Sequence, residues 1–220
     1  MLRLIDISKQ FPQRGLVLDK LSFEAVKGDS IAVTGPSGSG KTTLMNIIGT
    51  LDRPDSGDIQ FEDRSLTGMN PDELADYRNK NIGFVFQDHL LFKHLTIREN
   101  IMMPLFSEKI SNDELAEKEI YCLDLMKLVG IESIADKYPF QVSGGEAQRS
   151  ALVRALIRRP SVLLADEPTG SLDAGNAELL GRLLVDLNRE FSLTLIVATH
   201  SPDLASRMKR HLKLDNGKLT

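Results

Sequence analysis

The feature that most constrains this chain is the run GPSGSGKT at positions 35–42, which fits the pattern G-x-x-x-x-G-K-[ST]. It follows a short apolar segment, Ser30–Thr34, which is typical of a buried parallel strand, and it opens a predicted helix from Lys41 to about Leu51. This order brings loop N–H groups and a helix N-terminus around one point, which favours phosphate binding. The alternative, a glycine-rich turn with an exposed lysine, does not explain the flanking strand and helix.

This loop predicts a site for ATP and Mg²⁺. Lys41 should reach the β- and γ-phosphates, and the hydroxyl of Thr42 should bind Mg²⁺. The other residues of this segment that are expected to contact the nucleotide are Gly35, Pro36, Ser37, Gly38, Ser39, Gly40 and Thr43.

Three further short apolar segments predict buried strands, and each runs into a polar side chain. They are Ile82–Phe86, followed by Gln87, Ser161–Ala165, followed by Asp166, and Thr194–Ala198, followed by Thr199 and His200. Ligands of open parallel sheets bind at the carboxyl ends of the strands, so these polar groups should converge near the phosphate loop.

The chemistry of each group suggests a role. Asp166 ends a buried strand, where a carboxylate needs a cationic partner, and we expect that partner to be Mg²⁺. Glu167 should orient or deprotonate the attacking water. His200 is expected to bond to the γ-phosphate or to Glu167, and Gln87 to place water or contact Mg²⁺. A single His or Gln has a purely structural role as its alternative.

A second anion-binding segment, Ser143-Gly144-Gly145-Glu146, precedes a predicted helix from about Glu146 to Arg158. Its small residues leave backbone N–H groups bare at a helix N-terminus. The alternative is an ordinary helix cap with a glycine turn. Helices dominate the middle of the chain, which suggests one domain over 1–220, with a nucleotide-binding core at 1–87 and 160–220 and a helical subdomain at 88–159.

The composition narrows the classes of function. Hydrophobic residues make up 41% and charged residues 26%, which is typical of a folded globular chain. The net charge of −4 argues against a nucleic-acid binder that works through a basic face. Cys122 is the one cysteine, so no internal disulfide forms, and it is expected in the core. No apolar run is long enough to span a bilayer, so a membrane role would act through partner proteins.

Together the motifs resemble the ATP-binding cassette (ABC) family over essentially the whole chain. The phosphate loop resembles the Walker A motif, Val162–Asp166 resembles Walker B, and Glu167 resembles the catalytic glutamate. Val142–Glu146 resembles the signature motif, and Ser171–Asp173 resembles the D-loop. Gln87 resembles the Q-loop glutamine, and His200 resembles the switch histidine.

The departures from the family pattern are small. Val142 and Glu146 replace Leu and Gln of the signature, and Ala147 stands where a longer polar residue is usual. Phe11 falls where the family places an aromatic residue that stacks on adenine, with a plain core role as its alternative.

The resemblance implies an α/β fold: a P-loop NTPase core with a parallel sheet, a small antiparallel β-subdomain and a helical insertion. It implies a homodimer in which Ser143 and Gly145 of one subunit complete the site over ATP held by Lys41 of the other. It further implies an ATPase that drives a membrane permease from the cytoplasmic face of the inner membrane, without nucleic acid and without inserting into the bilayer.

Three segments, at 49–57, 84–91 and 99–104, resemble the lipoprotein-releasing and macrolide-exporter branch of the family. That likeness implies release of lipoproteins from the inner membrane to a periplasmic carrier. Alternatives are a related macrolide or peptide exporter and an ABC-type regulator of cell division. Outside the family, a P-loop nucleotide kinase is the rival class, and it would need an acceptor pocket and an arginine-bearing lid.

The segment His89–His94 (HLLFKH) is a run of mostly apolar side chains directly after Gln87. If it is exposed, it suits a permease helix, and we expect the permease contact near His89–Pro104. A polar change at Leu91 or a charge reversal at Lys93 would then uncouple the ATPase from the permease. If the segment is buried, it seats the helical insertion instead.

Overall fold

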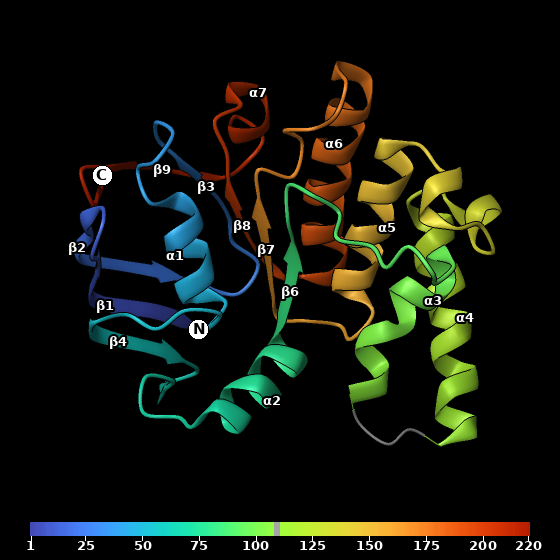
Figure 1. Ribbon diagram of the computed structural model, residues 1–220, viewed down its shortest axis with the longest axis horizontal. Coiled ribbons are helices and arrows are strands. Elements are labelled where there is room, and N and C mark those ends of the chain that lie inside the picture. The colour runs from blue at the N-terminus through green and yellow to red at the C-terminus, as the bar shows by residue number, and fades with distance from the viewer. Residues whose placement is uncertain (108–110) are drawn as a thin grey trace.

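The computed structural model describes residues 1–107 and 111–220 (Figure 1). Its strands are β1 Leu2–Phe11, β2 Gly15–Ala25, β3 Ser30–Thr34, β4 Ser56–Phe61, β5 Arg64–Ser65, β6 Ile82–Val85, β7 Val162–Asp166, β8 Thr194–Ala198, β9 Arg210–Asp215 and β10 Lys218–Leu219. Its α-helices are α1 Lys41–Ile48, α2 Pro71–Asn81, α3 Ile97–Met102, α4 Asn112–Leu128, α5 Gly144–Leu156, α6 Ala174–Phe191 and α7 Pro202–Ala205. Three short 3₁₀ helices span Met103–Ser107, Glu132–Ile134 and Pro139–Gln141.

The core is a six-stranded sheet in the order β10-β9-β3-β8-β7-β6. Strands β9, β3, β8, β7 and β6 are parallel, and β10 pairs antiparallel with β9. Every residue of β7 and β8 is buried, which explains their uninterrupted apolar sequences. The parallel strands point the same way, so their carboxyl ends form one edge of the sheet.

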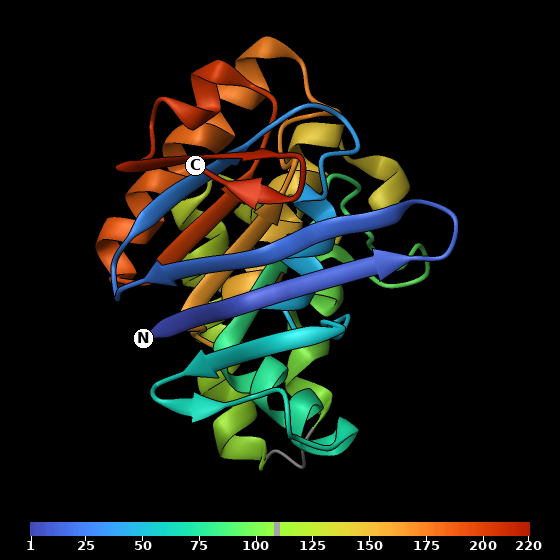
Figure 2. The ribbon, with the colours of Figure 1, turned by 90° about the vertical axis from the view of Figure 1, so that its left-hand side faces the viewer.

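A second sheet, β2-β1-β4-β5, is antiparallel (Figure 2). Alternate side chains of its strands, with those of α1 and the buried faces of β3, β7 and β8, form one apolar cluster. A second cluster joins the other face of the parallel sheet to α3, α4, α5 and α6. Cys122 on α4 is fully buried in this second cluster, as the sequence predicts.

The helical region, with α3, α4 and α5, lies on the β6 side of the sheet, opposite the antiparallel sheet (Figure 1). Its α4 begins with a capping box, in which Ser111 and Glu114 bond reciprocally. The predicted fold class is therefore confirmed. No helix of residues 1–107 and 111–220 is both long and apolar enough to cross a membrane.

Some predicted element ends were wrong. Helix α1 ends at Ile48 rather than near Leu51, because the chain turns at Gly49 and Thr50 has a left-handed φ of 54°. Within the predicted helical subdomain at 88–159, the segment from His89 to Thr96 is an irregular loop. Helix α5 starts at Gly144, directly after the cap Ser143.

Candidate active site

The phosphate loop leaves β3 at Thr34 and enters α1 through Gly40. Gly40 has a left-handed φ of 103°, and a Cβ at this position would lie 2.8 Å from Cγ1 of Val17, so both conformation and space require glycine. Lys41 is buried, and its Nζ donates to the carbonyls of Gly35 (2.9 Å) and Pro36 (3.2 Å). The lysine thus lies inside the loop that the sequence predicts to hold phosphates.

Asp166, the last residue of β7, is a buried carboxylate beside α1. Its Oδ1 is buried and has no hydrogen-bond partner. Burial raises the pKa of the Asp166 carboxyl above its usual value, while the Thr42 hydroxyl acts in the opposite direction. An unpartnered buried carboxylate oxygen beside a hydroxyl is a donor set that fits Mg²⁺, so the residues present are compatible with the expected metal.

Glu167 follows directly and is turned by a left-handed backbone (φ 47°). Its Oε1 lies 3.8 Å from Nζ of Lys41. Its Oε2 lies 2.9 Å from Nδ1 of His200 and accepts from the His200 backbone N–H at 3.2 Å. The ends of β7 and β8 thereby bring the predicted base and the predicted histidine into contact, with the His200 ring largely exposed.

Gln87 lies two residues beyond the end of β6, and its side chain is exposed. Its backbone carbonyl accepts from the hydroxyl of Ser171 at 3.3 Å. A Cβ on Gly170 would lie 3.4 Å from the Gln87 amide, so this amide rests against the turn that follows Glu167. The end of β6 therefore lies beside the turn that follows Asp166 and Glu167, at the sheet edge where the sequence predicts it.

Phe11 lies at the end of β1, half-buried and paired with Gly15 across the hairpin. The ammonium of Lys9 lies 5.3 Å from the centre of its ring. An open pocket of about 640 Å³ lies between this hairpin and the phosphate loop. Its lining residues are Arg14, Leu16, Val17, Pro36, Ser37, Gly38, Ser39, Asp215, Asn216 and Gly217.

The signature segment forms the N-terminus of α5. The Oγ of Ser143 accepts from the Glu146 N–H, and a carboxylate oxygen of Glu146 accepts from the N–H (2.7 Å) and the hydroxyl (2.8 Å) of Ser143. Ser143 and Gly144 are exposed. Helix α1 packs on β7 and β8, whereas α5 packs on β6 and α3, so the two helix ends that are predicted to bind anions lie apart in one chain (Figure 1).

Two polar residues of α5 that sequence reasoning missed tie this helix to the Q-loop. The buried side chain of Gln148 donates to the carbonyl of Phe86 at 2.7 Å. Arg154 donates to the carbonyls of His89 (2.8 Å) and Leu90 (2.7 Å). The available signal was a Gln at a position that the helical pattern assigns to the core, where a polar group needs a partner.

The loop after Gln87 exposes apolar side chains and also buries one. Leu90 is 55% and Phe92 54% exposed, while Leu91 is only 8% exposed and belongs to the core. The prediction that Leu91 contacts a partner was therefore wrong. Leu90 adopts a left-handed φ of 48°, which turns the loop so that Leu91 points inward.

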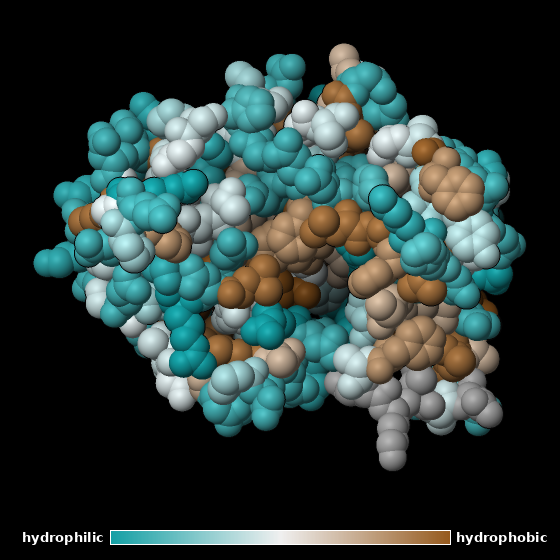
Figure 3. Space-filling model, viewed as in Figure 1, coloured by the Kyte–Doolittle hydropathy of each residue, from teal (hydrophilic) through white to brown (hydrophobic). Residues whose placement is uncertain are grey.

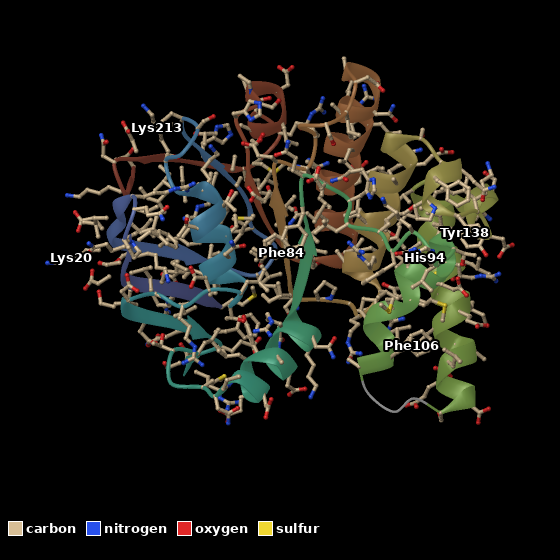
Figure 4. The ribbon with its side chains drawn as sticks, in the orientation of Figure 1. Lys20, Phe84, His94, Phe106, Tyr138 and Lys213 are labelled. Atoms are coloured by element: carbon tan, nitrogen blue, oxygen red, sulfur yellow. The ribbon has the colours of Figure 1, made fainter. Side chains whose placement is uncertain are left out.

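Further along, Met103 and Phe106 are 36% and 57% exposed. We call Leu90, Phe92, Met103 and Phe106 the apolar surface. Apolar side chains gather around a hollow in the middle of this face (Figure 3). In Figure 4, Phe84 lies on β6 and Phe106 lies in the helical region.

Comparison with known proteins agrees with this geometry. The family model described as "ABC transporter" matches residues 18–170. The lipoprotein-releasing system ATP-binding protein LolD of Myxococcus xanthus is 43% identical over 93% of this chain and 90% of its own length. The ABC transporter ATP-binding protein YxdL of Bacillus subtilis is 45% identical over 92% of this chain and 77% of its own length.

Among solved structures, the chain is similar to the dimeric ATP-binding cassette MJ0796 in a post-hydrolysis state bound to ADP and Pi. The TM-score is 0.88 with 35% identity, covering 100% of this chain and 96% of that one. Fold, motif geometry and relatives agree that this chain belongs to the ABC transporter family, as an ATP-binding cassette that hydrolyses ATP.

Proposed function

We propose that ATP is hydrolysed between two copies of this chain, with Lys41 of one copy and Ser143 of the other on opposite sides of the nucleotide. The observation that carries this proposal is the division of the site. One strand edge gathers Lys41, Asp166, Glu167 and His200, whereas the signature segment lies apart with its Ser143 and Gly144 exposed. The similar cassette MJ0796 is dimeric with ADP and Pi bound, which supports the assembly of two copies.

In this site each group of the chain has a task that its geometry suits. Lys41, now bonded to the Gly35 and Pro36 carbonyls, exchanges them for phosphate oxygens. Glu167 takes the proton of the attacking water, and His200 holds its carboxylate through Nδ1. Asp166 and Thr42 would hold Mg²⁺, which when bound neutralises phosphate charge. Phe11 stacks on adenine, and Gln87 places the attacking water or contacts Mg²⁺.

The signature segment of the other copy supplies the second half of the nucleotide site. Bare N–H groups at the start of α5 and the helix dipole stabilise negative charge on the γ-phosphate across the interface. Ser143, Gly144, Gly145 and Glu146 form this segment, and Glu146 keeps Ser143 in its capping conformation.

The apolar surface binds a membrane permease. Leu90 and Phe92 lie on a loop that α5 holds through Arg154, so a partner bound to this loop is connected through Arg154 to the helix that follows Ser143. Exposed aromatic and aliphatic side chains suit a helix of the partner. The chain would then sit at the cytoplasmic face of the inner membrane without entering it.

The transport reaction we propose is release of lipoproteins from the inner membrane. LolD proteins of Myxococcus xanthus and Bacteroides fragilis match at 43% and 41% identity, the latter over 100% of both chains. The similar identity to YxdL favours a second candidate, a related exporter with another cargo. Purification of the chain with its permease, followed by stimulation of phosphate release by a lipoprotein or by another cargo, distinguishes the two.

The two-copy site is tested with Glu167→Gln, which should bind ATP without hydrolysing it. We expect this variant to form dimers with ATP and Mg²⁺ by light scattering, and to remain monomeric with ADP. Adding Ser143→Arg should block dimer formation because the arginine fills the interface. Persistent monomers of Glu167→Gln, or full turnover by Ser143→Arg in the assembled complex, would contradict the proposal.

A further inference from the structure

Asn176, in the first turn of α6, connects the signature segment to the D-loop within one chain. Its backbone N–H donates to Oδ1 of Asp173 at 2.9 Å, and its side-chain Nδ2 donates to Oδ2 of Asp173 at 2.7 Å. On its other side, Oδ1 of Asn176 accepts from Nη1 of Arg149 on α5 at 3.2 Å. Both ends of the Asn176 amide are thus engaged, one by the D-loop and one by the signature helix.

The same amide occupies the space beside Gly145. A Cβ on Gly145 would lie 2.2 Å from Oδ1 and 2.5 Å from Cγ of Asn176, far inside van der Waals contact. The amide cannot turn away without losing its bonds to Asp173 and Arg149. Gly145 has no left-handed φ, so its backbone conformation gives no reason for glycine. Within the chain, the reason is the position of Asn176.

Arg149 extends this connection toward Ser143. The bond to Asn176 fixes a guanidinium that is half-buried and whose Nε has no hydrogen-bond partner. The hydrogen bonds from Ser143 chiefly lower the pKa of the Glu146 carboxyl, and the charges of Lys137 and Arg149 lower it further. Hydrogen bonds therefore join Asp173, Asn176 and Arg149, and the charge of Arg149 acts on the Glu146 carboxylate that caps Ser143.

We propose that Asn176 is a positioning residue of the ATPase, which holds the signature segment at a fixed place relative to the D-loop. It does not touch ATP; it acts through Gly145 and Arg149. Without the Asn176 side chain, the start of α5 gains conformational freedom. The signature segment then contacts the nucleotide of the second copy in many orientations instead of one. This catalytic part rests on the proposed two-copy site, whereas the steric relationship between Asn176 and Gly145 does not.

The catalytic part is tested by Asn176→Ala in the purified protein. We expect kcat for phosphate release to fall about 10- to 100-fold, as for other displaced catalytic groups. The dissociation constant of fluorescent ATP for the isolated chain should stay unchanged, because the Lys41 side of the site is intact. Asn176→Gln keeps both a donor for Asp173 and an acceptor for Arg149 and should recover part of kcat, whereas Asn176→Asp sets a second carboxylate against Asp173 and should not.

Asn188 on the same helix is a matched control. It is buried, and its Nδ2 donates to the carbonyls of Asp29 (3.0 Å) and Leu193 (2.6 Å), away from the nucleotide edge. Asn188→Ala should lower Tm and leave kcat per folded molecule unchanged. If Asn176→Ala behaves in the same way, or if it weakens ATP binding to the single chain, the positioning role is wrong.

The steric part is tested by thermal unfolding of Gly145→Ala, Asn176→Ala and the double variant without nucleotide. Gly145→Ala should lower Tm by about 5 °C in the natural background and by much less when Asn176 is alanine. An equal loss in both backgrounds would overturn the steric assignment. This double-variant cycle measures the single chain and needs no second copy. If Gly145 and Asn176 are coupled in Tm but Ser143→Arg still allows dimers to form, only the two-copy site is contradicted.

Discussion

The imidazole Nδ1 of His200 lies 2.9 Å from Oε2 of Glu167, and the backbone N–H of His200 donates to the same oxygen at 3.2 Å. One carboxylate oxygen is thus held from two sides by the end of β8. The other, Oε1, lies 3.8 Å from Nζ of Lys41. The arrangement orients the Glu167 carboxylate between the Lys41 ammonium and an exposed ring.

His200→Ala should therefore lower kcat about 100-fold or more, within the range of lost acid–base assistance, while ATP affinity changes little. The backbone N–H bond survives the substitution, so Glu167 keeps half of its support. His200→Gln places an amide near the same oxygen and should retain more activity than the alanine variant. A steady-state assay of phosphate release measures both, and equal activity of His200→Ala and the natural chain would contradict the assignment.

Asp166→Asn should stabilise the chain without nucleotide and abolish hydrolysis. Since burial raises the pKa of Asp166 in the folded state, the charged form lowers the free energy of unfolding. This loss is absent at pH values below the ordinary value of 3.8 and grows as the pH rises from 3.8 through the folded-state pKa. Asparagine removes the charge, and we expect a gain of about 1 kcal/mol, or about 2–4 °C in Tm.

The same variant should lose the additional rise in Tm that Mg²⁺ produces over ATP alone. Calorimetry with ATP and EDTA, and with ATP and Mg²⁺, separates the two effects. If Asp166→Asn has a lower Tm than the natural chain without nucleotide, the Asp166 carboxylate has a stabilising partner in the chain, and the assignment to a cation site is contradicted.

Phe92→Ser and Leu91→Ser form a matched pair at adjacent positions. Phe92 is exposed, so its replacement should leave Tm and basal ATPase activity unchanged but reduce stimulation by the permease about 10-fold. Leu91 is buried, so its replacement should lower the free energy of unfolding by about 2–4 kcal/mol. Stimulation assays in reconstituted membranes and chemical denaturation test them. If the permease still stimulates the ATPase activity of Phe92→Ser fully, this loop does not contact the permease.

The parts of the fold that sequence predicts well are those in which one short segment carries the whole signal. The run at 35–42 contains strand exit, glycine turn and helix start, and the polar groups at the ends of β6, β7 and β8 follow from apolar runs that stop abruptly. Parallel strands then bring these ends together, because the topology leaves only one edge for them.

The parts that sequence reasoning missed depend on contacts between distant segments or on irregular backbone. Gly145 lies against Asn176 across 31 positions of the chain, and Gln148 bonds to Phe86 across 62. Neither pair shares a local pattern. Leu91 turns inward because Leu90 takes a left-handed conformation, which no periodicity of apolar residues reveals. Side-chain to backbone bonds of this kind become visible only once the loop is folded.

Arg154 gives the last prediction, because it holds the loop of the apolar surface from α5. Its two Nη groups donate to the carbonyls of His89 and Leu90 at 2.8 and 2.7 Å, and burial lowers the pKa of its guanidinium. A lysine keeps the charge but cannot reach two carbonyls with a planar fork. Arg154→Lys should therefore weaken coupling without removing the charge from the site.

We expect Arg154→Lys to retain its basal ATPase activity and to lose most of the stimulation by the permease, with Arg154→Ala more severe in stability. Arg182, exposed on α6 and paired with Glu178, is the control, and Arg182→Lys should change neither quantity. Hydrogen exchange of residues 88–96 reports the loop directly: it should rise in Arg154→Lys and not in Arg182→Lys. If residues 88–96 of Arg154→Lys exchange faster but the permease still stimulates its ATPase activity fully, the coupling does not require Arg154 to order the loop before the permease binds.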